Sequence, residues 1–344
     1  MRTIEWKNGI VTTIDQTKLP TEVLLLKISS CKELAEAIKT MQIRGAPLLG
    51  AAAAYGLALT AYHSGASHKE QLLKELNASA QLLKQTRPTA VNLFWSIDRI
   101  LKRATKTVGN VETVAQTVVA EAEKIAAEDV EMNRKIGEHG SSLLNEGDTI
   151  LTHCNAGSLA TVDYGTALGV IRTAWKSGKE IKVVATETRP LLQGARLTTY
   201  ELLRDGIPVT LITDSMVGYI MEKKMVDNVV VGADRIVKDA VVNKIGTYAI
   251  AVLAHTHNIP FYVAAPKSTF DLNRMAKDVV IEERKAEEVT QFAGVKTTPR
   301  NVAVFNPAFD MTPLKYVTAI ICEVGVLSPR TSSMHTLRAH DYFP

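Results

Sequence analysis

Two side chains that can act in catalysis stand where short apolar runs end. Cys154 follows "TILTH" (149–153), and Asp234 closes "VVVGAD" (229–234). A thiol can act as a nucleophile or a base, and a carboxyl group can donate or accept a proton. The two residue types therefore suit acid–base or covalent catalysis.

Cys154 admits two interpretations. A cysteine at the end of a strand is often a small apolar core residue. The alternative is a reactive thiol, because "THCNAGSLATVDYG" (152–165) is expected to open a helix. The N-terminus of a helix lowers the pKa of a thiol and stabilises the thiolate. The small residues after Cys154 suit a tight turn with exposed backbone N–H groups, which favours the reactive thiol.

Asp234 also admits two interpretations. Partial burial at the mouth of a strand would raise the pKa of its carboxyl group and suit acid–base work. The alternative is a helix N-cap or an ion pair with Arg235. Asp214, in "LITDSMVGY", has a similar position, and we expect it to be an N-cap.

Arginines precede two predicted helices. Arg44 and Gly45 stand just before Pro47, a residue favoured in the first helical turn. Arg87 is followed by Pro88, which favours an extended backbone at the arginine. Free backbone N–H groups and a guanidinium together suit an anion. Either arginine alone could form an ordinary ion pair, but two such sites facing polar strand ends favour a phosphate in a cleft.

The sequence gives no support for several other chemistries. It contains no dinucleotide-binding glycine fingerprint, no phosphate-binding P-loop motif and no nucleophile elbow. His255 and His257 lie on a predicted helix without a third ligand at metal spacing, so we expect them at the surface. We predict neither a metal nor a cofactor. Asn243 and Lys244, in a predicted short loop, complete the polar candidates.

The elements that must position these residues fall into two groups. Residues 1–28 predict short strands with a hairpin turn at Asn8–Gly9, and residues 30–144 predict helices. After Asp148, β-branched runs alternate with amphipathic stretches, which is typical of a parallel sheet with helical crossovers. The predicted strands are "TILTH", "KVVATE", "PVTLIT", "NVVVGAD", "PFYVAA" and "VAVFN".

We therefore predict an α/β protein with a mostly helical domain over 1–126 and a parallel-sheet domain over 127–344. Ligands of open parallel sheets bind outside the carboxyl ends of the strands. The residues at those positions are unusually polar: His153, Cys154 and Asn155; Glu187, Thr188 and Arg189; Asp214 and Ser215; Asp234 and Arg235.

Composition restricts the class of protein. A chain of 344 residues with 46% apolar residues has enough bulk for two domains, and its formal charge of +4 does not single out nucleic acid or acidic lipid as a partner. The three cysteines are Cys31, Cys154 and Cys322, an odd and widely spaced set that argues for a reducing compartment. No apolar run is long enough to span a membrane. We expect a cytoplasmic protein.

A series of segments, taken in order, resembles the 5-methylthioribose-1-phosphate isomerases of methionine salvage. The resemblance extends over roughly residues 1–330. The segments are "MQIRGAPLLGAAAAYGLAL", "TRPTAVNL", "THCNAGSLATVDYGTALG", "ATETRPLLQGARLTTYEL", "VVVGADRI", "NKIGTYAIA" and "VFNPAFDMTP". The wider family includes archaeal ribose-1,5-bisphosphate isomerases and regulatory subunits of a eukaryotic translation-initiation exchange factor.

The resemblance implies a fold, an assembly and a site. The expected fold is a helical N-terminal domain followed by a Rossmann-like C-terminal domain, and the expected assembly is a homodimer. Cys154 and Asp234 would be the catalytic pair of an aldose–ketose isomerase that acts on a small sugar phosphate. The expected substrate contacts are Arg44, Gly45, Ala46, Arg87, Gln193, Asn243 and Lys244.

Two alternatives within the wider family remain open at this point. A ribose-1,5-bisphosphate isomerase would carry a second phosphate where the methylthio group lies. A regulatory subunit would need no catalytic pair, so the presence of both Cys154 and Asp234 argues against it.

Overall fold

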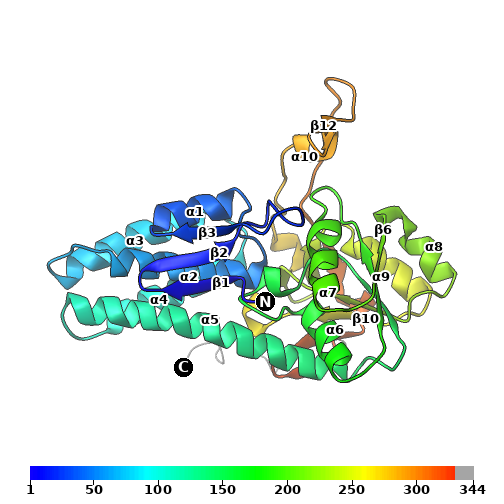
Figure 1. The fold of residues 1–344 in the computed structure, drawn as a ribbon, viewed down its shortest axis with the longest axis horizontal. Helices are drawn as coiled ribbons and strands as arrows, with labels where there is room; N and C mark the ends of the chain where they lie inside the picture. The colour runs from blue at the N-terminus through cyan, green and yellow to red at the C-terminus, as the bar shows by residue number, and fades with distance from the viewer. Residues whose placement is uncertain (330–344) are drawn as a thin grey trace.

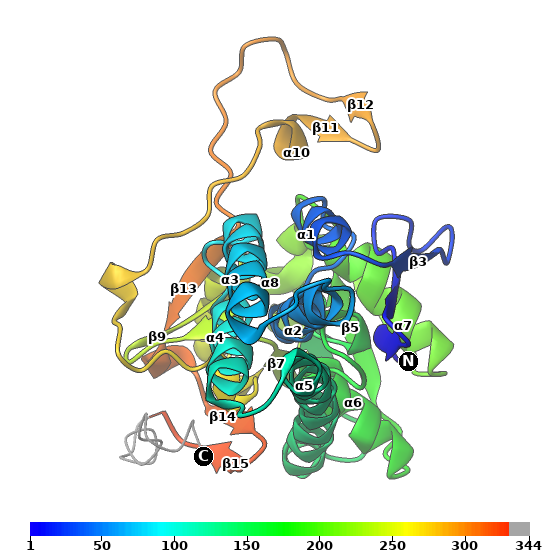
Figure 2. The ribbon, with the colours of Figure 1, turned by 90° about the vertical axis from the view of Figure 1, so that its left-hand side faces the viewer.

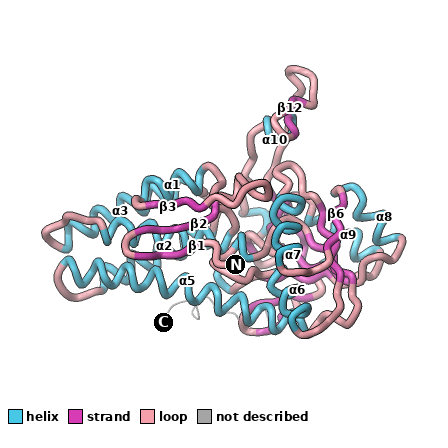
Figure 3. The backbone as a smooth tube through the Cα atoms, in the orientation of Figure 1, coloured by secondary structure: helices cyan, strands magenta, loops and turns pink. Residues whose placement is uncertain are grey.

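The computed structural model describes residues 1–329, which form a mixed α/β structure, as predicted. In Figure 1 the N-terminal helices occupy one end of the molecule and the large sheet the other. Figure 3 shows that loops, rather than helices or strands, make up much of the region between them. Among the described residues, no helix is both long and apolar enough to cross a membrane.

The N-terminal end combines a small sheet with five helices. The antiparallel strands are β1 (Ile4–Lys7), β2 (Ile10–Ile14) and β3 (Leu25–Ile28). Asn8 and Gly9 both have positive φ, as the predicted hairpin turn requires. The helices are α1 (Cys31–Lys39), α2 (Ala46–Tyr62), α3 (Lys69–Thr86), α4 (Val91–Lys106) and α5 (Val111–Ser141).

Helix α2 is the centre of this bundle. Its sequence is apolar on every side, and fourteen of its seventeen residues are buried. A helix without a polar face must be surrounded, and α2 packs against α1, α3, α4 and α5. Its first residues, which follow Arg44, are thereby held at a fixed place facing the sheet.

Helix α5 joins the two ends of the molecule. It is continuous over 31 residues and runs along the lower edge of the view in Figure 1. Ala122 and Ala126 belong to the helical core, whereas Ile136 packs in the core beside the large sheet. The predicted boundary at residue 126 thus falls inside an unbroken helix, and the division into two domains there stays a prediction.

Asp129 on α5 gives a prediction about stability and pH. Its carboxylate accepts a hydrogen bond from the backbone N–H of Val162 at 2.7 Å, and burial raises its pKa to about 7. Between pH 4 and 7 the folded chain therefore binds a proton at this site that the unfolded chain has lost, so stability falls as pH rises through this window. Asp129→Asn should stabilise the protein at pH 8 by about 1–2 kcal/mol.

The measurement for Asp129→Asn is urea unfolding at pH 5 and pH 8. Glu131→Gln, on an exposed stretch of the same helix, is the matched control and should change little at either pH. If the difference in free energy of unfolding between Asp129→Asn and the natural protein is no larger at pH 8 than at pH 5, the expected linkage is wrong.

A seven-stranded sheet forms the other end, in the order β15-β14-β10-β7-β4-β5-β6. All neighbouring strands are parallel except the β14–β15 pair. The bounds are β4 (Thr149–Thr152), β5 (Lys182–Thr186), β6 (Val209–Ile212), β7 (Asn228–Val231), β10 (Phe261–Ala264), β14 (Ala319–Cys322) and β15 (Gly325–Leu327). The first five predicted strands are confirmed.

The sixth predicted strand is wrong. Residues 302–306 ("VAVFN") form no strand, and Phe305 is 79% exposed. A parallel strand covered on both faces must be buried throughout, and Ala319–Cys322 meets that condition. Apolar content alone made the exposed run resemble a strand.

Helices cover both faces of the large sheet, and neighbouring strand residues face opposite ways. Ile150 packs with α5 and α6 (Ala167–Lys176), and α7 (Thr199–Arg204) lies in the same layer. Leu151 packs on the other face with α8 (Val217–Glu222) and α9 (Thr247–Thr256). This alternation is the period of two expected of a strand.

Two smaller elements border the sheet. The strands β8 (Arg235–Ile236), β9 (Ala240–Lys244) and β13 (Phe309–Pro313) form an antiparallel sheet. The chain between β10 and β13 includes a projection, visible in Figures 1 and 2, that carries α10 (Glu287–Thr290), β11 (Gln291–Phe292) and β12 (Val295–Lys296).

Candidate active site

The predicted catalytic pair flanks the point where the sheet changes its winding direction. The chain runs from β4 outward through β5 and β6, then returns to add β7 on the other side of β4. Such a switch point opens a crevice beyond the carboxyl ends of the two central strands. Cys154 follows β4, and Asp234 follows β7, so the topology brings both into this crevice.

A cavity lies at the switch point. It is closed on one side by the start of α2 and the α3–α4 junction, and on the other by the ends of the strands. All nine residues predicted for the site line it: Arg44, Gly45, Ala46, Arg87, Cys154, Gln193, Asp234, Asn243 and Lys244.

The prediction that Cys154 lies at a helix N-terminus is wrong. Residues 153–166 form an irregular loop with one 3₁₀ turn at Ser158–Ala160, and the next α-helix begins only at Ala167. The backbone of Cys154 itself has the left-handed conformation, with φ of 63°. Burial raises the pKa of its thiol, against the opposing effect of Lys244 and Arg44. The free site therefore holds a neutral thiol at neutral pH.

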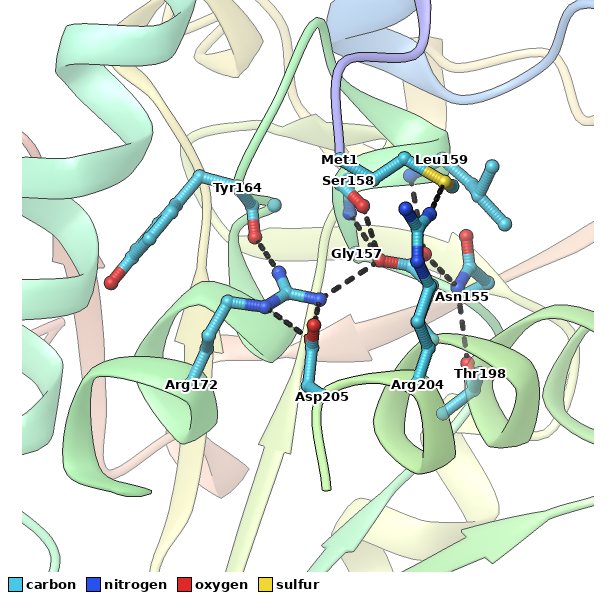
Figure 4. A network of polar contacts seen from close by, with 12 residues as sticks. Met1, Asn155, Gly157, Ser158, Leu159, Tyr164, Arg172, Thr198, Arg204 and Asp205 are labelled. Carbon is cyan, nitrogen blue, oxygen red and sulfur yellow. Dashed lines mark hydrogen bonds and ion pairs between the residues drawn. The ribbon is translucent and has the colours of Figure 1, made fainter. Parts of the chain in front are cut away.

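A buried carboxylate anchors the loop that follows Cys154. Glu201 accepts hydrogen bonds from the backbone N–H groups of Ser158 at 2.7 Å and Leu159 at 3.1 Å, and from the amide of Asn155 at 3.0 Å. Arg172 binds the same carboxylate at 3.1 Å and pairs with Asp205. Figure 4 shows these partners converging from the loop and from two helices.

Sequence analysis missed Glu201. It stands in an amphipathic stretch ending in "ELLRDG", where a charged residue is normally exposed. Burial opposes its ionisation, but Arg172 and the surrounding hydrogen-bond donors lower its pKa below the ordinary value. An added Cβ at Gly157 would lie 2.3 Å from the carboxylate, so the glycine in "NAGS" was the one available sign of a close neighbour.

Asp234 has neither of the two structural roles weighed for it. Arg235 pairs instead with Asp271, at 3.5 Å, and no helix begins at Asp234. Its side chain is half-buried on the cavity wall. Burial raises the pKa of its carboxyl group, although Lys244, Arg87 and Arg44 oppose the shift. This favours a carboxyl group that retains a proton to donate.

Arg44 is held by the Cys154 loop. One of its terminal nitrogens, Nη2, donates to the carbonyl and side-chain oxygens of Asn155, at 2.9 and 2.8 Å. Gly45 lets this happen, because an added Cβ there would lie 2.5 Å from the Cα of Ala160. The other nitrogen, Nη1, is buried without a hydrogen-bond partner among residues 1–329, which leaves a charged donor for a ligand.

Arg87 lies between α3 and α4, as predicted. It forms an ion pair with Glu282 at 3.3 Å, so the ordinary role weighed for it is present. Its Nε nevertheless has no partner within the described part of the chain, although it is buried. Arg87 and Arg44 thus bring two guanidinium groups to one cavity wall.

The remaining predicted contacts come from the turn after β5 and from the end of β9. The prediction that Asn243 and Lys244 lie in a short loop is wrong, because both pair with β13 as the last residues of strand β9. Gln193 follows β5, and its buried Oε1 accepts no hydrogen bond from any described residue. Lys244 and Asn243 end β9, where the ammonium group donates to the carbonyl of Ala308 at 2.9 Å and the amide donates to Thr247 at 3.0 Å. Burial lowers the pKa of Lys244, while Cys154 and Asp234 support its charge.

Other lining residues were not singled out from the sequence. Arg284 lies in the charged run "EERKAEE", which is typical of a solvated surface. Phe309 places its ring 4.8 Å from the Lys244 ammonium group. Only the folded chain brings these distant segments to the cavity.

Two lesser predictions have different outcomes. Asp214 caps no helix with its side chain; its carboxylate accepts hydrogen bonds from the backbone N–H groups of Thr188 and Arg189, at 2.8 and 2.7 Å.

His255 is exposed and His257 is half-buried at the end of α9. Across residues 1–329 there is no cluster of three His, Cys, Asp or Glu side chains that could hold a metal ion.

Arg44→Ala and Arg87→Ala should each chiefly raise KM for a phosphorylated substrate. Loss of one charge-assisted contact corresponds to about 1.5–3 kcal/mol of binding. Steady-state kinetics of both variants is the measurement, and Arg274→Ala, on an exposed side chain near Arg235, is the matched control. An unchanged KM in both cavity variants would move the phosphate elsewhere, with Lys244 as the next candidate.

Comparison with known proteins identifies the family. The model of the initiation factor 2 subunit family matches residues 42–329. The chain belongs to this family.

Similar proteins over nearly the whole chain are named as isomerases of one sugar phosphate. A putative methylthioribose-1-phosphate isomerase of Archaeoglobus fulgidus is 58% identical, with 96% of each chain covered. A methylthioribose-1-phosphate isomerase of Desulforudis audaxviator is 52% identical, covering 94% of this chain and 93% of that one.

Two similar solved structures carry different descriptions. The 5-methylthioribose 1-phosphate isomerase of Pyrococcus horikoshii is 48% identical, with a TM-score of 0.91 over 98% of this chain and 95% of that one. A structure described as the delta subunit of translation initiation factor eIF-2B, from A. fulgidus, is 57% identical, with a TM-score of 0.86 over 96% of each chain.

Proposed function

We propose that the protein is an aldose–ketose isomerase that converts 5-methylthioribose 1-phosphate to 5-methylthioribulose 1-phosphate. The observation that carries this proposal is the meeting of Cys154 and Asp234 at the switch point, beside two arginines that each have a buried donor nitrogen without a partner in residues 1–329. The names of the similar proteins agree with it. The test is turnover of this sugar phosphate by the purified protein.

The substrate explains why an acid is needed. A phosphate on the anomeric oxygen prevents spontaneous opening of the sugar ring to a free aldehyde. Asp234 donates a proton to the ring oxygen as the bond between C1 and that oxygen breaks. The raised pKa of Asp234 supports this role. Arg44 and Arg87 hold the phosphate that stays attached to C1.

Hydrogen must then move from C2 to C1, by one of two routes. In the first, Cys154 removes the C2 proton, an enediol-like intermediate forms, and a proton returns to C1. In the second, hydride passes from C2 to C1 while the C2 hydroxyl gives its proton to the Asp234 carboxylate, which ring opening has left ionised, and Cys154 stabilises charge. Because burial raises the pKa of Cys154, little thiolate is present in the free site at neutral pH to act as a base, which favours the second route.

Isotope labelling distinguishes these routes. Substrate carrying deuterium at C2 is converted in ordinary water, and the product is examined at C1 by NMR. Full retention of the label eliminates exchange with solvent and supports the hydride shift. Appearance of solvent hydrogen at C1 supports the proton-transfer route.

An apolar recess favours the methylthio sugar over ribose 1,5-bisphosphate. The recess opens beside Asp234 and Gly45, and much of its wall is aliphatic: Leu49, Ala90, Val242, Val279, Val280 and Ile281. Arg87 and Arg235 also line it, but they already pair with Glu282 and Asp271. A methylthio group loses little by entering such a space, whereas a second phosphate would be desolvated against the aliphatic wall and would compete for paired arginines. Assays of both sugar phosphates on one sample test this preference.

A regulatory role is the alternative from a different class, because one similar structure is described as a translation-factor subunit. Such a subunit needs neither the Cys154 thiol nor the Asp234 carboxyl group. Turnover well above that of an Asp234→Asn sample would exclude a purely regulatory protein.

We further propose a cytoplasmic homodimer. The resemblance to dimeric isomerases supports the assembly, and exposed apolar side chains near the edge strand β6, including Leu211, Met216 and Tyr219, could be covered by a second copy. The three cysteines lack disulfides in the structure, which suits a reducing compartment. Light scattering of the purified protein tests the oligomeric state.

A further inference from the structure

His153 lies at the centre of a chain of short hydrogen bonds beside the cavity. Its Nδ1 is 2.6 Å from Thr186 Oγ1, and its Nε2 is 2.8 Å from the carbonyl oxygen of Ile245. Thr186 Oγ1 is 3.0 Å from Thr188 Oγ1, which accepts a hydrogen bond from the backbone N–H of Cys154 at 2.9 Å. The chain therefore runs from Ile245 to Cys154.

The direction of both His153 bonds is determined. The Ile245 carbonyl can only accept, so Nε2 of His153 carries a proton and donates. Burial lowers the pKa of His153, so the ring is neutral and Nδ1 accepts from the Thr186 hydroxyl. Thr186 has then used its only proton, and the single hydroxyl proton of Thr188 lies within reach of both Thr186 Oγ1 and the Thr186 carbonyl oxygen, at 3.0 and 3.3 Å. Reversal at His153 would leave a buried donor or acceptor without a partner.

The chain joins the two turns that carry groups of the proposed reaction. One turn holds Cys154, directly after His153. The other runs from Lys244 through Ile245 to Gly246, where φ is +104° and an added Cβ would lie 3.1 Å from the imidazole ring. Gly246 thus admits the ring, and the ring sets the separation between the two turns.

We propose that His153, as the neutral Nε2–H tautomer, is a positioning residue that holds the Lys244 turn against the Cys154 turn. This rests on the proposed function, because that function gives Cys154 and Lys244 their roles. The physical reason is the charge of Lys244, which acts most strongly on Cys154 among the neighbouring cations. If the turn loosened, the Lys244 ammonium group would move away from the Cys154 thiol. The charged groups that act on His153 itself are Asp214 and Lys244.

Three substitutions separate the two bonds of the ring. His153→Phe keeps the shape and removes both bonds. His153→Gln keeps a donor near Nε2 for the Ile245 carbonyl, and His153→Asn keeps an acceptor near Nδ1 for Thr186. If the Ile245 bond holds the Lys244 turn, the Gln variant should resemble the natural protein and the Asn variant should resemble the Phe variant.

The readout is the rate of Cys154 alkylation by iodoacetamide as a function of pH, followed peptide by peptide with mass spectrometry. The midpoint reports the thiolate fraction, not access to the thiol. We expect it to rise by about half a pH unit or more in the Phe and Asn variants. For the proposed isomerase, kcat should fall on the order of ten-fold or more in the same two variants.

The matched control is His63→Phe. His63 also places Nε2 at 2.8 Å from a backbone carbonyl, that of Gly9, but it lies outside the cavity lining. It should leave both readouts unchanged. The proposal would be overturned if the alkylation midpoint of His153→Asn equalled that of the natural protein. Equal midpoints in the Gln and Asn variants would overturn it as well. If the Phe variant does not fold, the Gln and Asn pair decides.

The alkylation assay needs no sugar phosphate. A natural protein that fails to turn over the methylthio sugar would refute the proposed function and leave this measurement intact. A protein that turns over the sugar but keeps its midpoint in His153→Asn would refute only the role of His153.

Discussion

Asp234→Asn is expected to leave the fold intact and to lower kcat by about three orders of magnitude, the upper part of the range for general acid–base catalysis. The amide has nearly the shape of the carboxyl group but cannot give the ring oxygen a proton. In the natural enzyme the acid form is the active one, so kcat should fall as pH rises through the pKa of Asp234. Because burial raises that pKa, the falling limb should lie above the ordinary carboxyl range.

The pH profile makes this prediction specific. The Asn variant should keep its residual rate but lose that limb, since the titrating group is gone. Asp239→Asn makes the same chemical change on an exposed turn of the neighbouring β8–β9 hairpin and should behave as the natural protein. Near-normal kcat in Asp234→Asn would remove the general-acid assignment.

Cys154→Ser is expected to melt normally and to lose on the order of two decades of activity or more. A hydroxyl has similar size, but its much higher pKa and lower polarisability suit neither proton removal nor stabilisation of a developing charge. The expected thermal stability follows from geometry, because the Cys154 backbone N–H and carbonyl make their hydrogen bonds with Thr188 and Thr198 independently of the sulfur.

Alkylation gives a second test of Cys154. Iodoacetamide should inactivate the natural protein, and saturating substrate should slow the inactivation, because the thiol lines the cavity. Cys31 and Cys322 are buried and do not line the cavity, whereas Cys154 is partly exposed in it, so neither should account for the loss. Cys322→Ser is the control and should remain both active and sensitive. Full turnover by Cys154→Ser would return Cys154 to a purely structural role.

The sequence predicts helices and strands well where the hydrophobic period of a segment agrees with its burial in the fold. The strands β4, β5, β6, β7 and β10 follow from short β-branched runs, and the helix starts after Arg44 and Arg87 follow from the prolines. Lining of the cavity by the nine predicted residues follows from the general rule that ligands meet strand ends, together with the family resemblance. Their catalytic and binding roles stay predictions until the variants are assayed.

The failures share a cause, which is that long-range contacts are not visible in a local pattern. The Cys154 loop looked like the start of a helix, but Glu201 satisfies its backbone N–H groups instead. The run "VAVFN" is apolar, yet no strand lies beside it. Strand order is also non-local, so the sequence could not show that β4 and β7 are neighbours and that Cys154 and Asp234 therefore face one crevice.

The continuous helix α5 limits how the cavity can widen. At 1.5 Å per residue, its 31 residues make a rod roughly 46 Å long, and bending that rod sharply would break consecutive backbone hydrogen bonds. The helical bundle and the large sheet are therefore joined by one unbroken rod, which resists any motion that needs a hinge within residues 111–141. Arg87 and Glu282 form a second link, between the α3–α4 junction and the chain after β10. An ion pair can separate and re-form without breaking a backbone hydrogen bond, so widening of the cavity would leave α5 intact and act on links of this kind.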